Sequence, residues 1–97
     1  MELLTDDQIT AELTGSPGWT LANGEITRTF TRDDFRGAML LVGAVAFLAE
    51  KVNHHPDIDI RWNQVTLALV THSAGGLTAA DFDLARRISA LTESRSG

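Results

Sequence analysis

The sequence predicts an α+β domain in which a four-stranded antiparallel sheet carries helices on one face, in the order α-β-β-α-β-β-α. Three observations predict it. Capping-box signals open helical segments near both ends of the chain, a long apolar helical segment occupies the middle, and two stretches of alternating apolar and polar residues surround tight-turn signals. A chain of 97 residues has room for one domain, which we assign to residues 1–97.

The first helix begins at a capping box formed by residues 5–8 (TDDQ), in which side chains satisfy exposed amide groups of the first turn. Leu4 and Ile9 occupy the positions of a hydrophobic staple around this cap. We expect the helix to run to about Leu13 and to stop near Gly15.

The first hairpin is predicted by residues 19–22 (WTLA) and 25–30 (EITRTF), which alternate apolar and polar residues on either side of Asn23-Gly24. Asn-Gly tolerates the positive φ angles that a tight hairpin turn requires.

A long helix from about Phe35 to Asn53 can be capped by Asp33 or Asp34. Its apolar residues cover most faces of the helix, so we expect it to be buried on more than one side. A small sheet covers one side only. Gly43 costs such a helix about 1 kcal/mol relative to Ala, and close approach of a neighbouring backbone is one way to offset that cost. We therefore expect the helix to pack against both the sheet and a second subunit.

The second hairpin follows Pro56, which ends the helical region. Apolar residues alternate with polar ones on both sides of Asn63-Gln64, which we interpret as a two-residue turn. The predicted cross-strand pairs are Trp62–Val65, Ile60–Leu67 and Ile58–Leu69. Continued to the strand ends, this register sets His55 opposite His72, with Cβ atoms about 5 Å apart.

The last helix opens with a second capping box at residues 78–81 (TAAD), with Leu77 and Phe82 at the staple positions. We expect it to end in a polar tail, Glu93 to Gly97. Its expected inward residues are Phe82, Ala85, Ile88 and Leu91.

Composition narrows the classes of function. The formal net charge is -5 and no basic stripe is visible, so we expect no binding to nucleic acid. There are no cysteines, which excludes disulfides and thiolate chemistry and fits a cytoplasmic location. Residues 1–10 lack the pattern of a signal peptide, and the longest uncharged stretch, 37–49, is too short to span a membrane, so we expect no membrane association.

All three histidines are predicted to lie near one end of the sheet. His54 and His55 end the long helix, and His72 ends the second hairpin. Glu50 lies four residues before His54, so the two can meet on one helix face, and Asp81 could reach the same pocket. Each residue has an ordinary structural explanation as a solvated cap or surface group. Imidazoles in different environments, gathered in one place, are suited to act as acid and base near neutral pH.

These residues resemble the signature of the pterin-4a-carbinolamine dehydratases. The signature consists of residues 50–56 (EKVNHHP) followed by Trp62, His72 and Asp81 at matching spacings. The resemblance extends over most of the chain from Gly18 to about Ile88. It implies dehydration of 4a-hydroxytetrahydrobiopterin to quinonoid dihydropterin, the recycling step after an aromatic amino acid hydroxylase. It also implies catalysis by histidine acid/base chemistry, without a cofactor or metal.

The resemblance also assigns roles residue by residue. The catalytic set is His54, His55, His72 and Asp81, with His54 and His72 as the acid/base pair and Asp81 as a supporting carboxylate. The substrate-binding set is Glu50, His54, His55, Pro56, Trp62, Thr71, His72 and Ser73. Some relatives carry a cysteine where this chain has Ala74, so one contact is in question. Relatives form dimers and tetramers, so we expect a homodimer or homotetramer through the 35–53 helix and the sheet edges.

Two alternatives remain open from the residues. A metal enzyme could use His54, His55 and His72 as ligands, because three histidines can hold zinc. A non-catalytic interaction module could use the apolar surface of the long helix to oligomerise or bind a partner.

Overall fold

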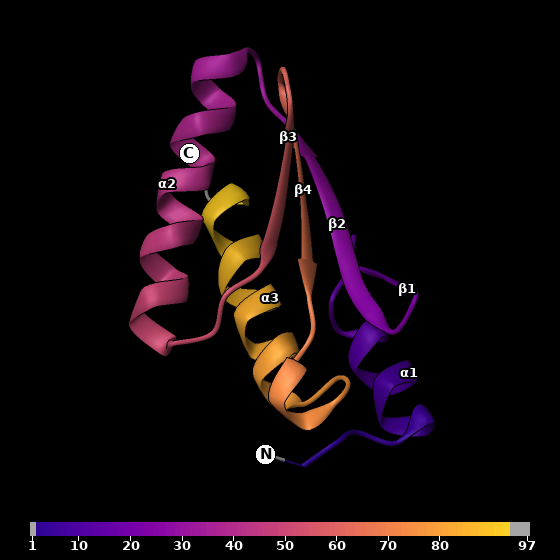
Figure 1. The fold of residues 1–97 in the computed structure, drawn as a ribbon. Coiled ribbons are helices and arrows are strands. Elements are labelled where there is room, and N and C mark those ends of the chain that lie inside the picture. The colour runs from indigo at the N-terminus through magenta and orange to yellow at the C-terminus, as the bar shows by residue number, and fades with distance from the viewer. Residues whose placement is uncertain (1, 94–97) are drawn as a thin grey trace.

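The structure is a computed structural model that describes residues 2–93. The predicted order of elements is confirmed (Figure 1). The elements are α1 (Asp6–Thr14), β1 (Thr20–Ala22), β2 (Glu25–Thr31), α2 (Phe35–Val52), β3 (Asp57–Arg61), β4 (Gln64–Leu69), the 3-10 turn η1 (His72–Ala74) and α3 (Ala79–Thr92). The predicted polar tail lies outside the described residues from position 94 onward.

One antiparallel sheet joins the four strands in the order β1-β2-β4-β3. Strand β4 pairs with β2 on one side and with β3 on the other. Its residues Val65, Leu67 and Leu69 are fully buried, whereas the residues between them are not, which is the alternation of a strand with one face on a core. Ile26 and Phe30 of β2 extend the same buried face.

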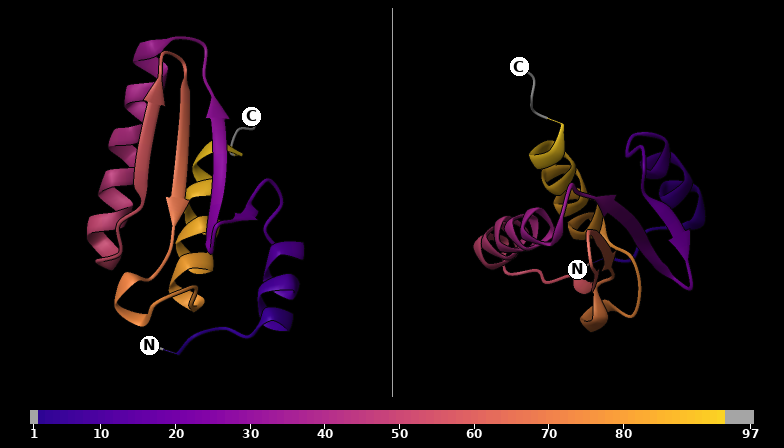
Figure 2. Two further views of the ribbon diagram at one scale, coloured as in Figure 1. Left: turned by 45° about the vertical axis from the view of Figure 1, so that its right-hand side comes forward. Right: turned by 90° about the horizontal axis from the view of Figure 1, so that it is seen from above.

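The helices cover one face of the sheet, as predicted, and Figure 2 shows α2 and α3 side by side there. Their buried residues form the other half of the core, and they are Ala38, Leu41, Val45 and Ala49 of α2 and Phe82, Leu84, Ala85 and Ile88 of α3. Leu91 was predicted to point inward, but it is exposed, because it lines an open groove against Leu40 at the last turn of α3. Within residues 2–93, no helix has the length and apolar character that crossing a membrane requires.

The predicted caps are present. Thr5 and Gln8 form one capping box and Thr78 and Asp81 form the other. Of the two candidate caps of α2, the structure selects Asp34, whose Oδ1 accepts a hydrogen bond of 2.7 Å from the backbone N–H of Gly37. The first hairpin turns at Asn23-Gly24 with φ angles of 55° and 79°, as a tight turn requires.

The predicted register of the second hairpin is wrong. The turn is Trp62-Asn63, with Trp62 at φ 52°, and Gln64 belongs to β4. The observed pairs are Asp57–Ala68, Ile58–Leu67, Asp59–Thr66, Ile60–Val65 and Arg61–Gln64. The Asn63 carbonyl accepts a bond of 2.8 Å from the N–H of Arg32, and its Nδ2 donates to the Arg32 carbonyl. These long-range bonds fix Asn63 at the tip of the hairpin.

The predicted pairing of His55 with His72 is also wrong, because the register is shifted and because neither residue belongs to the paired strands. The ladder between β3 and β4 ends at Asp57 and Ala68, and His72 lies in the 3-10 turn after β4. A bridge between Thr71 and Gly76 closes this turn, and it takes His72 out of the extended strand.

The choice of Asp34 as the helix cap is testable. Asp34→Ala should lower the free energy of unfolding by about 1 kcal/mol, because the first turn of α2 loses an acceptor for a backbone N–H. Asp33→Ala is the matched control and should cost less than about 0.5 kcal/mol. Urea unfolding at one fixed protein concentration measures both, and equal losses would contradict the assignment.

Candidate active site

The candidate site lies at one end of the sheet, where β3 begins and β4 ends. The segment that follows α2 and the 3-10 turn η1 both reach this end (Figures 1 and 2). The His-His-Pro segment and His72 are thus brought to the same end of the molecule, although they are not paired across strands.

His54 is held by a buried carboxylate. Its Nε2 lies 2.6 Å from Oδ1 of Asp81; the Asp81 side chain is 0% exposed and that of His54 is 16% exposed. The cause is local: Asn53 adopts a left-handed conformation with φ 54°, which ends α2, and the N–H of His54 closes the turn on the Ala49 carbonyl. His54 then faces the first turn of α3 instead of continuing the surface of α2.

The predicted contact between Glu50 and His54 is wrong, because Glu50 contacts His55. Oε2 of Glu50 lies 2.6 Å from Nε2 of His55, and both side chains are exposed. The helix ends before His54, so the four-residue spacing no longer places it above Glu50. The chain reversal at Asn53 separates the two histidines into a buried pair and a solvent-facing pair.

Asp81 accepts two further hydrogen bonds on its second oxygen. The backbone N–H of Thr78 donates at 2.9 Å as part of the capping box, and the hydroxyl of Thr71 donates at 2.8 Å. An ionised carboxylate has the acceptor capacity for all three contacts. The buried carboxyl group of Asp81 therefore has hydrogen-bond partners from three different segments of the chain.

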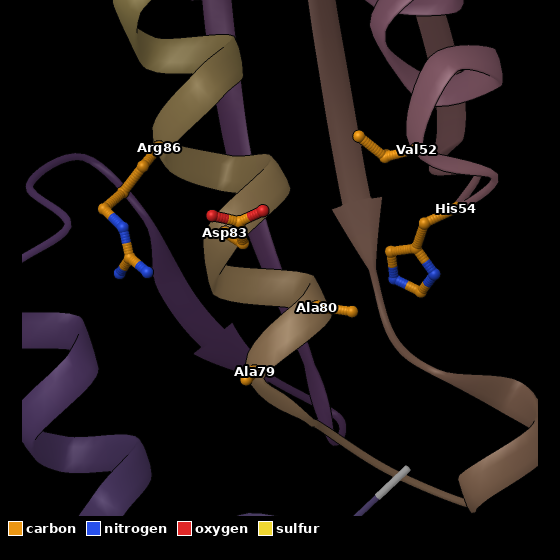
Figure 3. A pocket seen from close by; sticks show the side chains of 6 residues that line it. All are labelled: Val52, His54, Ala79, Ala80, Asp83 and Arg86. Carbon is orange, nitrogen blue, oxygen red and sulfur yellow. The ribbon is translucent and has the colours of Figure 1, made fainter.

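A cavity of about 390 Å³ adjoins His54 between the end of α2 and the start of α3 (Figure 3). Such a volume lies within the range of about 300–1,000 Å³ that small-molecule sites occupy. Its lining residues are Val52, His54, Ala79, Ala80, Asp83 and Arg86. Sequence reasoning missed Asp83 and Arg86. Asp83 and Arg86 lie four and seven residues after Ala79, so all three share one face of α3. This helical spacing could have identified them from the sequence.

The remaining predicted residues lie in different surroundings. His72 and Ser73 are exposed in η1, and Pro56 is half-buried directly before β3. Trp62 is 65% exposed at the hairpin tip, five residues along the strand from Asp57 and so about 16 Å from the start of β3. Within one chain, the structure does not bring Trp62 to this end of the sheet.

Thr71 is buried, and its polar atoms are engaged within the chain. Its hydroxyl bonds to Thr78 and Asp81, its N–H donates to the Gly76 carbonyl, and its own carbonyl accepts from Ala74 and Gly75. These contacts leave little of Thr71 for a direct contact with a ligand.

The contact with Asp81 determines which nitrogen of His54 is available for chemistry. When Asp81 is ionised it only accepts hydrogen bonds, and the donor in this contact is then Nε2 of His54. In the neutral ring Nδ1 is then the unprotonated nitrogen, and Figure 3 shows one ring nitrogen turned toward α3 and the other turned away. The arrangement can take up or release a proton at Nδ1 while Nε2 stays bound to the carboxylate.

Among residues 2–93, no three side chains of His, Cys, Asp or Glu are grouped as ligands of one metal ion. The two short histidine contacts go instead to separate carboxylates, Asp81 and Glu50.

Comparison with known proteins identifies a family. The family described as pterin 4 alpha carbinolamine dehydratase matches residues 2–91. A protein from Nocardia farcinica, provisionally named a pterin-4-alpha-carbinolamine dehydratase, is 54% identical over 90 residues, covering 93% of this chain and 95% of its own. A protein from Acidobacterium capsulatum with the same provisional name is 54% identical over 91 residues, covering 94% of this chain and 99% of its own.

Two solved structures share the fold. The crystal structure of a transcriptional coactivator/pterin dehydratase from Brucella melitensis has a TM-score of 0.89 at 34% identity, covering 93% of this chain and 98% of that one. A pterin dehydratase-like protein identified as a RuBisCO assembly factor in the alpha-carboxysome has a TM-score of 0.64 at 22% identity. The match covers 79% of this chain and 89% of that one. The second likeness shows the fold alone.

The assignment of the His54 proton can be measured directly. In ¹⁵N NMR spectra of the histidine side chains, neutral His54 should carry its proton on Nε2, because Asp81 accepts it there. Asp81→Asn should shift the ring toward the Nδ1–H form, since an amide can donate to Nε2. His55, whose carboxylate partner is exposed, is the internal comparison and should show a weaker preference. A native protein with His54 mainly in the Nδ1–H form would contradict the assignment.

Proposed function

Because the chain belongs to the pterin 4 alpha carbinolamine dehydratase family, we propose that it is a hydro-lyase that dehydrates 4a-hydroxytetrahydrobiopterin to quinonoid dihydropterin. In this proposal it acts in the recycling of the tetrahydropterin. The observation that carries the proposal is the hydrogen bond of 2.6 Å between His54 and the fully buried Asp81, which holds one imidazole in a fixed orientation.

The reaction needs two proton transfers and no redox partner. The bond between C4a and the hydroxyl oxygen breaks, and the oxygen leaves as water after receiving one proton. The adjacent ring nitrogen N5 loses its proton, and its electron pair forms the new C4a=N5 double bond. One proton is given and one is taken, so a pair of imidazoles near neutral pH supplies the whole chemistry.

We assign the two proton transfers to His54 and His72. For His54 the transfer occurs at Nδ1, because Nε2 is bound to Asp81. A buried carboxylate in this position keeps the ring in one tautomer and stabilises it when it is protonated. His55, Pro56 and Ser73 are the proposed pterin contacts, and the Glu50 carboxylate orients His55. The pH–rate profiles of His54→Ala and His72→Ala decide which histidine gives a proton and which takes one.

We further propose that the protein acts as a homo-oligomer, through α2 and the sheet edges. Leu40 and Phe47 lie two turns apart on α2 and are 69% and 68% exposed. Gly43 lies between them on the same face, and a Cβ added there would meet nothing within 4 Å in the single chain. A second helix packed on this face would bury both large side chains and would account for a glycine that one subunit does not require. Strand β3 is an unpaired edge along which Ile58 and Ile60 are both exposed.

A dehydratase assay with chemically prepared carbinolamine tests the proposed reaction. His54→Ala and His72→Ala should each lower kcat by about 10²–10⁴-fold, because each removes an acid/base group. Asp7→Asn, on the exposed surface of α1, is the control and should keep the native rate. Activity should also survive a strong chelator, which separates this mechanism from the metal alternative. Unchanged rates in both histidine variants would end the proposal.

Sedimentation velocity tests the proposed assembly. The double variant Leu40→Glu, Phe47→Glu should sediment as a smaller species than the native protein, because each substitution places a charge in the proposed interface. Asp7→Lys, a charge reversal on the exposed surface of α1, is the control and should leave the sedimentation coefficient unchanged. A native protein that sediments as a monomer at about 50 μM, a concentration at which micromolar or tighter dimers are assembled, would contradict the proposal.

A further inference from the structure

A chain of buried hydroxyl groups supports the carboxylate that holds His54. The Thr71 hydroxyl oxygen lies 2.8 Å from Oδ2 of Asp81 and 2.8 Å from the hydroxyl oxygen of Thr78. All three side chains are buried, and the side chains of Thr78 and Asp81 are inaccessible to solvent. The direction of each hydrogen bond in this chain follows from counting protons.

Thr71 has one hydroxyl proton, and it donates that proton to Asp81. In the contact with Thr78 the Thr71 oxygen must therefore accept, so the Thr78 hydroxyl is the donor. The Thr78 oxygen in turn accepts the backbone N–H groups of the first turn of α3, from Ala80 at 3.2 Å and from Asp81 in the capping box. Every proton of the chain thus points from the start of α3 through Thr78 and Thr71 to the carboxylate.

The direction of these hydrogen bonds restricts rotation of the Asp81 carboxyl group. Oδ2 of Asp81 receives two donors, the Thr71 hydroxyl and the Thr78 N–H, which leaves Oδ1 for Nε2 of His54. Rotation of the carboxyl group would leave buried donors without acceptors, at a cost of about 1–3 kcal/mol for each one. The hydroxyl of Thr71 therefore restrains the carboxylate that in turn orients the imidazole.

We infer that Thr71 is a positioning residue of the reaction, which acts on His54 through Asp81 instead of contacting the substrate. The expected effect of Thr71 on kcat rests on the proposed function. Its expected effect on the orientation of Asp81 and His54 rests only on the hydrogen bonds of Thr71. It assigns to Thr71 a role different from the substrate contact that the sequence resemblance implies.

Two variants of Thr71 separate a positioning role from other roles. Thr71→Val keeps the shape of the side chain and removes the hydroxyl, whereas Thr71→Ser keeps the hydroxyl. Thr71→Val should lower kcat by about tenfold or more, which is the usual cost of removing an outer support of a site. KM should stay within about twofold, because no substrate contact is lost. Thr71→Ser should restore most of kcat.

The matched control is Thr66→Val. The hydroxyl of Thr66 lies 2.8 Å from that of Thr29 on strand β2, so this variant breaks a Thr–Thr pair of the same length without any link to Asp81. It should leave kcat and KM at native values. The spectroscopic readout is the proton on Nε2 of His54, which should exchange with solvent faster in Thr71→Val than in the native protein or in Thr66→Val.

The outcomes are distinct. A raised KM with unchanged kcat would show that Thr71 contacts substrate, and equal losses in Thr71→Val and Thr71→Ser, with unaltered exchange at His54, would show a merely structural role. Either result overturns the inference.

If Thr71→Val fails to fold, the native protein decides, because its Thr71 hydroxyl proton should be protected and visible by NMR. A native protein without dehydratase activity would refute the proposed function, while the NMR measurements would still test the hydroxyl chain.

Discussion

A carboxyl group that is buried from solvent needs hydrogen-bond partners from the protein around it. Asp81 is such a group, because its side chain is fully buried. Its three donors come from three segments: His54 after α2, Thr71 after β4 and Thr78 at the start of α3. One buried carboxyl group therefore connects the end of α2, the end of β4 and the start of α3. The same contacts that satisfy this carboxyl group orient the imidazole, so fold and candidate chemistry share their central interaction.

The elements of the fold could be predicted because their signals are local. Capping boxes at Thr5 and Thr78 and the Asn23-Gly24 turn involve residues within a few positions of one another. The register of the second hairpin could not be predicted in this way. Asn63 is held at the tip by two hydrogen bonds to Arg32, a residue of the connection between β2 and α2, and no local pattern reports that contact.

The residues of the candidate site were selected from the sequence, but their contacts could not be predicted in the same way. His54 and Asp81 were selected by type and spacing, and the structure brings them together. The helical spacing from Glu50 to His54 failed, because it assumes that α2 continues past Asn53, whose left-handed backbone reverses the chain. Thr71 could not be understood from sequence, because its role depends on a loop that closes between Thr71 and Gly76 and brings α3 back beneath it.

In the proposed reaction, His54 presents Nδ1 to a pterin while Nε2 stays on Asp81. A crystal structure with a stable pterin that lacks the 4a-hydroxyl tests it most directly. We expect the pterin ring between the His54–Pro56 segment and η1, with Nδ1 of His54 facing the ring and the contact of 2.6 Å with Asp81 retained. A pterin bound away from His54, or a His54 ring turned so that Nε2 faces the ligand, would contradict it.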